Sequence, residues 1–185
     1  MGIKVVTPPA TEPVTLAEAK LHLRVDTSDE DALISRLISA AREQCEQEID
    51  RSVAPQTLML LLDAFPAGAI LLPRGPVASI TSVQYVDAAG ALQTVSGANY
   101  TIDDAQIDAW LLPAYGYEWP AARDQANAVR VTYQSGYTAC PEAIRQWILL
   151  AVGTMYATRE ADSDRPAVPQ NFAARLLDRY RVGAL

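Results

Sequence analysis

The spacing of hydrophobic positions changes twice along this chain, and the first stretch, residues 14–54, is free of proline and predicts helices. Thr15 and Glu18 form a capping box, which predicts a short helix from there to about Leu23. A longer helix is expected to begin at the N-cap Ser28 and to end near Arg51. Its apolar stripe has three- and four-residue spacing and consists of Leu33, Ile34, Leu37, Ile38, Ala41, Cys45 and Ile49.

The middle stretch, residues 55–139, is punctuated by proline and changes to short apolar or alternating runs. These runs predict strands. The expected strands are 58–62, 70–72, 82–85, 92–95, 100–102, 110–112 and 129–133. Asp87–Gly90 is expected to form a hairpin turn. Because connections this short do not allow parallel crossovers, the sequence predicts an antiparallel sheet.

In the third stretch, helix returns at Pro141 with a wide apolar face. That face consists of Ile144, Trp147, Ile148, Ala151, Val152 and Met155. Residues 159–170 are polar and predict a mobile loop. A last helix, about 171–182, is expected to place Phe172, Leu176 and Tyr180 on one side.

The predicted fold class is therefore α+β, a small bundle of about four helices with an antiparallel β insertion between the second and third. We expect a single domain over residues 1–185, with a helical core at 14–54 and 140–185 and a β-rich insertion at 55–139. The chain is half hydrophobic, so it can form a core of this size.

The formal net charge of −7 argues against general nucleic-acid binding, which needs a surplus of Lys and Arg. Residues 1–54 and 55–139 each carry a net charge of −4, whereas residues 140–185 carry +1. Residues 1–13 have no apolar signal-peptide core, and no apolar run reaches membrane-spanning length. A cytoplasmic protein without a membrane partner is expected.

No residue pattern predicts catalysis, a cofactor or a metal. His22 is the only histidine, and its place between two leucines predicts a structural role. Cys45 and Cys140, at expected helix positions, are expected to be reduced and buried. Asp26–Asp31 fails the calcium-loop pattern at its glycine and final glutamate positions. A last acidic group, Asp103, Asp104 and Asp108, predicts a solvated turn.

One basic, aromatic-bearing patch stands out near the C-terminus, and it consists of Arg175, Arg179, Tyr180 and Arg181. Cations there can offset a helix dipole, or the patch can contact a partner, because Arg and Tyr are frequent at interfaces. We expect residues 159–185 to contribute to docking on such a partner. A separate aromatic group in the insertion favours core packing over a ligand site. Its members are Tyr100, Trp110, Tyr115, Tyr117 and Trp119.

The order and spacing of several segments resemble the head–tail connector (adaptor, or head-completion) proteins of long-tailed bacteriophages and prophages. The segments are Pro13–Asp26, Asp29–Ile34, Leu72–Pro76, Ile80–Val83, Pro113–Gly116, Val131–Tyr133 and Pro141–Gln146. The resemblance implies a helical bundle, here from the branch with a β insertion, and no catalytic residues.

The resemblance also implies partners. The subunit is expected to form a ring, twelve-fold on the portal protein, and to contact a downstream head-completion or tail protein. DNA would pass only as cargo, and the protein would end at the virion head–tail junction. Two alternatives stay open at this point: another phage morphogenesis role in DNA packaging or tail completion, or a ligand-binding or enzymatic domain that uses the insertion.

Overall fold

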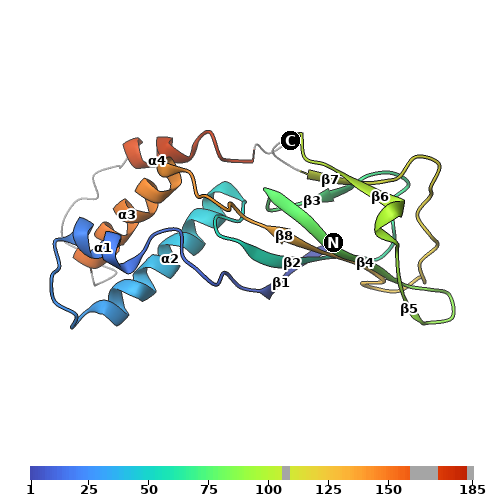
Figure 1. Ribbon diagram of the computed structural model, residues 1–185, viewed down its shortest axis with the longest axis horizontal. Helices are drawn as coiled ribbons and strands as arrows, with labels where there is room; N and C mark the ends of the chain where they lie inside the picture. The colour runs from blue at the N-terminus through green and yellow to red at the C-terminus, as the bar shows by residue number, and fades with distance from the viewer. Residues whose placement is uncertain (106–108, 159–170, 183–185) are drawn as a thin grey trace. The chain divides into compact units, whose positions relative to one another are not determined.

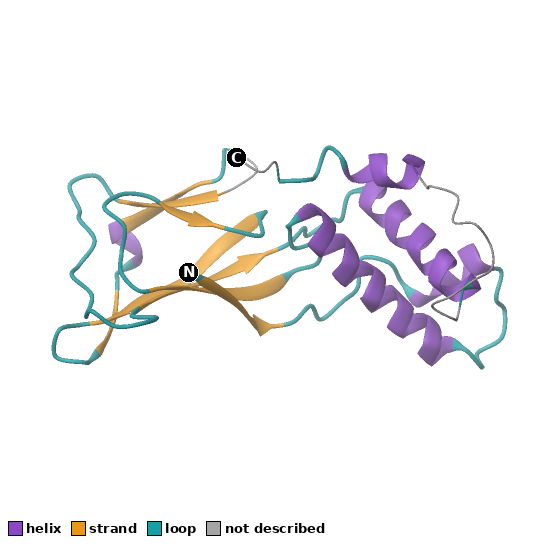
Figure 2. Cartoon of the chain, turned by 180° about the vertical axis from the view of Figure 1, so that it is seen from behind, coloured by secondary structure: helices purple, strands orange, loops and turns teal. Residues whose placement is uncertain are grey.

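The computed structural model describes residues 1–105, 109–158 and 171–182, and it contains two compact units. One unit consists of residues 1–10 and 55–136 and is built of strands; the other consists of residues 11–54 and 137–185 and is built of helices (Figures 1 and 2). The predicted α+β class, with a β region between the second and third helices, is confirmed. The prediction of a single domain over all 185 residues stays a prediction.

The helical unit contains four helices among the described residues: α1 (Leu16–Leu23), α2 (Asp31–Ile49), α3 (Glu142–Ala157) and α4 (Asn171–Leu177). Helix α1 packs against both α2 and α3, and α4 packs against α3. The stripe predicted on α2 supplies much of the core, because Ile34, Ile38, Ala41, Cys45 and Ile49 are buried. Ile144, Ile148 and Val152 of α3 complete it from the other side.

The beginnings of the first two helices differ in how well the sequence predicts them. The capping box at α1 is confirmed, since the Thr15 hydroxyl accepts from the Glu18 amide while Glu18 accepts from the Thr15 amide. The predicted N-cap Ser28 is wrong, because α2 begins at Asp31 with Glu30 as N-cap. Residues 28–31 form a turn instead, in which the Asp31 amide donates to the Ser28 carbonyl.

The capping box gives a simple stability test. Replacing Thr15 with alanine leaves the Glu18 amide without its acceptor, and we expect the free energy of unfolding to fall by about 1 kcal/mol. Urea denaturation followed by helical circular dichroism measures this change. Thr11, an exposed threonine outside the helix, is the matched control, and its replacement by alanine should change little. Equal effects at both positions would contradict the capping role.

The strands form two antiparallel sheets. The first has the order β1-β2-β8-β4-β5 and the second the order β3-β7-β6. The bounds are β1 Gly2–Thr7, β2 Gln56–Leu62, β3 Ile70–Leu72, β4 Val77–Val86, β5 Leu92–Thr94, β6 Tyr100–Asp103, β7 Ala109–Pro113 and β8 Val129–Ser135. All predicted strands are present, and the predicted antiparallel arrangement is confirmed.

One apolar core joins the two sheets, so they pack face to face. Leu58, Val83 and Val131 of the larger sheet share this core with Leu72 and Leu111 of the smaller one. Tyr133, fully buried on β8, adds a polar tie because its hydroxyl donates to the Pro73 carbonyl at 2.7 Å. Burial of that hydroxyl raises the pKa of Tyr133.

The predicted hairpin turn is also confirmed. The Asp87 carboxylate accepts from the amides of Ala89 and Ala91, both at 2.9 Å. Gly90 has φ +87°, which residues with a side chain rarely adopt. The side chain of Gln93 and these amides lower the pKa of Asp87. The turn therefore holds β4 and β5 in register.

Two features differ from the sequence prediction. Strand β1, which no pattern indicated, pairs with β2 and forms one edge of the larger sheet. The last helix ends at Leu177 rather than near residue 182, and it buries Ala173 and Leu177. Leu176, predicted on the packed side, is only half-buried, and the side chain of Phe172 lies outside the described residues.

Candidate partner interface

The C-terminal segment, defined here as residues 171–182, is anchored on the helical unit. Leu177 is fully buried in the core formed by α2 and α3. After the helix, the amides of Tyr180 and Arg181 donate to the Leu177 carbonyl, at 2.8 and 3.2 Å. The Val182 amide then donates to the Ile49 carbonyl at the end of α2. The segment is therefore part of the folded subunit.

The four residues of the predicted patch have different environments. Arg175 and Arg179 are exposed and form no ion pair with any described residue. Tyr180 is half-buried and packs against the helical core. Arg181 pairs with Glu48 of α2 at 2.7 Å. Arg175 and Arg179 are thus the members of the patch that can offer charge to a partner, while Tyr180 and Arg181 hold the segment in place.

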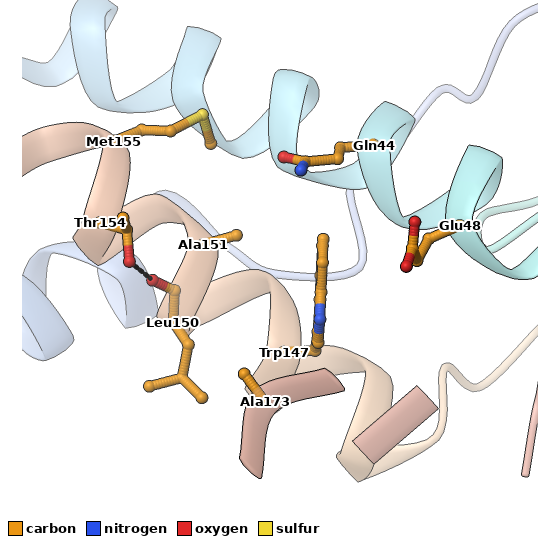
Figure 3. A pocket seen from close by; sticks show the side chains of 8 residues that line it. All are labelled: Gln44, Glu48, Trp147, Leu150, Ala151, Thr154, Met155 and Ala173. Atoms are coloured by element: carbon orange, nitrogen blue, oxygen red, sulfur yellow. Dashed lines mark hydrogen bonds between the residues drawn. The ribbon is translucent and has the colours of Figure 1, made fainter. Parts of the chain in front are cut away.

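A hollow of about 410 Å³ lies between α2, α3 and α4 in the same unit (Figure 3). Its lining residues are Gln44, Glu48, Trp147, Leu150, Ala151, Thr154, Met155 and Ala173. Figure 3 shows the Trp147 ring between the two longer helices, and Thr154 donates to the Leu150 carbonyl of its own helix. The polar residues of this lining are Gln44, Glu48 and Thr154, and they include no pair of groups suited to proton transfer.

The residues considered for chemistry lie apart. His22 lies against Gly153 of α3, where a Cβ would be 3.4 Å from its Nε2 atom. Cys45 is buried, whereas Cys140 is only half-buried and precedes α3 rather than lying on it. Burial raises the pKa of the Cys45 thiol to about 12 and that of Cys140 to about 11, so neither is a ready nucleophile.

The acidic residues considered as metal ligands also have defined environments in the described ranges. Asp103 and Asp104 are exposed, but Asp103 is the last residue of β6 and does not lie in a turn, and Asp108 lies outside the described residues. Asp31 pairs with Lys20 at 2.6 Å. No group of three His, Cys, Asp or Glu residues in residues 1–105, 109–158 and 171–182 could hold a metal ion. Among the helices described, none has the length and apolar character needed to cross a bilayer.

Most of the aromatic group in the insertion packs on the core of the strand unit. Tyr100, Tyr117 and Trp119 contact that core, and Trp119 stacks on Phe65 with ring centroids 5.0 Å apart. The Trp119 indole N–H donates to the Gly68 carbonyl at 2.8 Å. Tyr115, which follows β7, instead faces solvent fully. These contacts favour the core-packing interpretation over a ligand site.

A second candidate surface, strand β1, is not indicated by the sequence patterns considered above. Its six residues are all exposed, and Ile3, Val5 and Val6 are among the exposed large hydrophobic side chains of the chain. The apolar cluster from Ile3 to Val6 is the signal that could have indicated a strand. It lacks the alternation of a half-buried strand, because neither of its faces is buried.

The fold defines the class of a small α+β protein, and its candidate sites are surfaces for partners. Comparisons with known proteins identify the family. Residues 13–109 match the family of phage gp6-like head-tail connector proteins, and the chain belongs to that family. It is therefore a structural connector protein and not an enzyme. No curated protein matches the chain.

Solved structures of similar fold come from gene transfer agent (GTA) particles. A chain in the "Neck of empty GTA particle computed with C6 symmetry" is 26% identical with a TM-score of 0.82, and the alignment covers 100% of this chain and 97% of that one. Chains in the virion of the native GTA particle and in its neck, computed with C12 symmetry, are each 24% identical. Their TM-scores are 0.82 and 0.78 at the same coverage, so they show the same fold.

Proposed function

We propose that this connector protein forms a ring in the neck of a phage-like particle, docks beneath the portal and lines part of the DNA conduit. Family membership carries the proposal, because the chain matches head–tail connectors over residues 13–109. The similar chain at 26% identity belongs to a particle neck computed with C6 symmetry, which supports a cyclic assembly. The subunit would assemble in the host cytoplasm and remain at the virion head–tail junction, next to a downstream head-completion or tail protein.

The charge of the chain fits a conduit. A net charge of −7 gives a surface that repels DNA phosphates over a Debye length of about 8 Å at physiological salt. A conduit must let DNA pass without holding it, so DNA would be cargo rather than a bound ligand. This argument supports the proposal for a channel lined by residues 1–139, which carry the negative charge, because residues 140–185 carry a net charge of +1.

The C-terminal segment is the surface proposed to meet the portal. It belongs to the part of the chain, residues 140–185, with a net charge of +1, and it presents Arg175 and Arg179 to solvent. Arginine is well suited to carboxylates because its guanidinium donates two parallel hydrogen bonds. Removing the whole segment would be a poor test, because it would also remove the buried Leu177 from the helical core.

Point substitutions test the proposal without that loss. The double variant Arg175→Gln and Arg179→Gln should keep the subunit folded but weaken its binding to purified portal by roughly tenfold or more, since a hydrogen bond to a charged group typically contributes about 1.5–3 kcal/mol. Surface-immobilised portal and a concentration series measure the affinity. Binding by the unmodified chain should also weaken as salt is raised.

Arg36→Gln is the matched control, because Arg36 is an exposed arginine on α2. It should leave portal binding unchanged. If the double variant binds as tightly as the unmodified chain, the segment does not dock on the portal. If the unmodified chain neither binds portal nor forms rings on it, as seen by native mass and negative-stain microscopy, the connector-ring proposal itself fails.

A further inference from the structure

Strand β1 has an open edge. It pairs with β2 on one side, from Gly2 opposite Leu61 to Thr7 opposite Thr57, and no described strand pairs with its other side. Alternate residues of such an edge strand direct their N–H and C=O groups outward. All six residues are exposed, and the exposed fractions of Val5 and Val6 are 56% and 50%.

An edge of this kind is unusual for a protein that stays monomeric. Edge strands are normally kept short or carry charges, prolines or bulges that prevent pairing with another chain. Within β1 the only charged residue is Lys4, and the prolines Pro8 and Pro9 come after the strand. A bulge between Val5 and Thr7 lies at its far end. From Gly2 to Val5 the strand pairs with β2 in regular register and carries Lys4 as its one charge, so this part of the edge can accept another strand.

The opposite edge of the same sheet is also open. Strand β5 pairs with β4 alone among the described strands, and its three residues are all exposed. Leu92 on β5 is 51% exposed and is another of the exposed large hydrophobic side chains. One sheet thus carries two different open edges, each with apolar side chains. Association between two different surfaces of identical subunits proceeds head to tail, as a closed ring requires.

The direction of the strands restricts how two copies can pair. The four neighbouring pairs from β1 to β5 are all antiparallel, so after four reversals β1 and β5 run in the same direction. A rotation by a sixth or a twelfth of a turn keeps the direction of a strand within about 60° of its original one. The twist of the sheet also turns each strand by about 20–25° from its neighbour, and a subunit rotation in the opposite sense offsets part of that angle. With this offset, a β1 edge that meets the β5 edge of the next subunit meets it in parallel.

We propose that β1 of one copy of this chain pairs in parallel with β5 of the next copy, so that the larger sheet continues from subunit to subunit around the ring. The inference rests on the proposed ring and names the surface that closes it. The contact joins backbone groups along the two edges and covers Val5, Val6 and Leu92. A β1–β1 contact would be antiparallel and two-fold, and it would close a dimer instead of a ring.

Cysteine pairs on the two edges test the contact in complexes assembled on portal. Gly2→Cys, Lys4→Cys and Val6→Cys in one copy are each combined with Leu92→Cys or Thr94→Cys in another, and diamide is the oxidant. The native thiols give little background because burial raises their pKa values. In parallel pairing, the preferred partner moves from Leu92 toward Thr94 as the β1 site moves from Gly2 toward Val6. The opposite order, β1–β1 dimers or no edge cross-links would overturn the inference.

Charged substitutions provide a second measurement. The double variant Val5→Lys and Val6→Lys should raise the subunit concentration needed for ring formation by roughly tenfold or more, since burial of one valine typically contributes that factor. Leu92→Lys should act in the same direction. The control is Leu21→Lys, which changes a leucine that is 82% exposed on α1.

The two proposals can fail separately. If the unmodified chain forms rings on portal but the edge variants assemble equally well, the edge contact is wrong and the ring proposal stands. If the unmodified chain forms no ring on portal, the ring proposal fails and the edge contact fails with it. Circular dichroism of each variant confirms that the fold is kept, because Val5 and Val6 are not part of either buried core.

Discussion

Replacing Leu177 with alanine is expected to lower the free energy of unfolding of the helical unit by about 3 kcal/mol. Leu177 is fully buried and belongs to the same apolar core as Ile49 and Ile148. The substitution removes buried apolar area and leaves a cavity in that core. Because the hydrogen bonds after α4 converge on the Leu177 carbonyl, the C-terminal segment should also loosen from α2. Urea denaturation by circular dichroism at 222 nm measures the first effect, and amide exchange at Tyr180 and Val182 measures the second.

This experiment separates anchoring of the segment from contact with a partner. Leu177→Ala should weaken portal binding although Arg175 and Arg179 are unchanged, since an unanchored segment must be ordered on binding. Leu177→Met keeps most of the volume and should restore both stability and binding to a large extent. Leu21→Ala, at an exposed leucine, should change stability by less than about 0.5 kcal/mol. A Leu177→Ala variant as stable as the control would contradict the packing of α4.

Local patterns predicted much of the fold because they depend on residues close together in the chain. Three features of this kind are the capping box at Thr15 and Glu18, the stripe on α2 and the Asp87 turn. Each involves residues that lie close together in sequence. The start of α2 was mispredicted because Glu30 and Asp31 are engaged by Tyr156 and Lys20, which stabilises a turn at Ser28. Such contacts between distant residues cannot be seen in a local pattern.

The larger differences between the predicted and observed structure also come from contacts between residues far apart in the chain. Strand β1 is held by backbone pairing to β2, fifty or more residues away in sequence. Neither face of β1 is buried, so its residues show no alternation of apolar and polar positions. The central position of β8 between β2 and β4 is likewise set by pairing across the chain. In the C-terminal patch, composition indicated the right segment. Only the structure shows that Glu48 pairs with Arg181 while Arg175 and Arg179 stay exposed.

Replacing Arg42 with methionine is expected to lower the free energy of unfolding by about 3–4 kcal/mol, because it leaves a buried carboxylate without its cation. The Arg42 side chain is 8% exposed and that of Glu46 is 7% exposed, and they meet at 3.1 Å. Arg42 Nε also contacts Glu12 at 2.8 Å. Burial by itself lowers the pKa of Arg42, but the carboxylates of Glu12 and Glu46 outweigh it and raise that pKa.

Glu46 also supports the backbone where the chain leaves α2, since it accepts from the Val53 amide at 2.9 Å. Glu46→Gln keeps that acceptor but removes the charge, so it should cost less than Arg42→Met. The double variant should lose less unfolding free energy than the two single variants lose together. A double-mutant cycle by urea denaturation measures this coupling. Arg36→Met on the exposed side of the same helix should cost little. Strict additivity in the cycle would show that the pair is not coupled, and the stability of this end of α2 would then come from apolar packing.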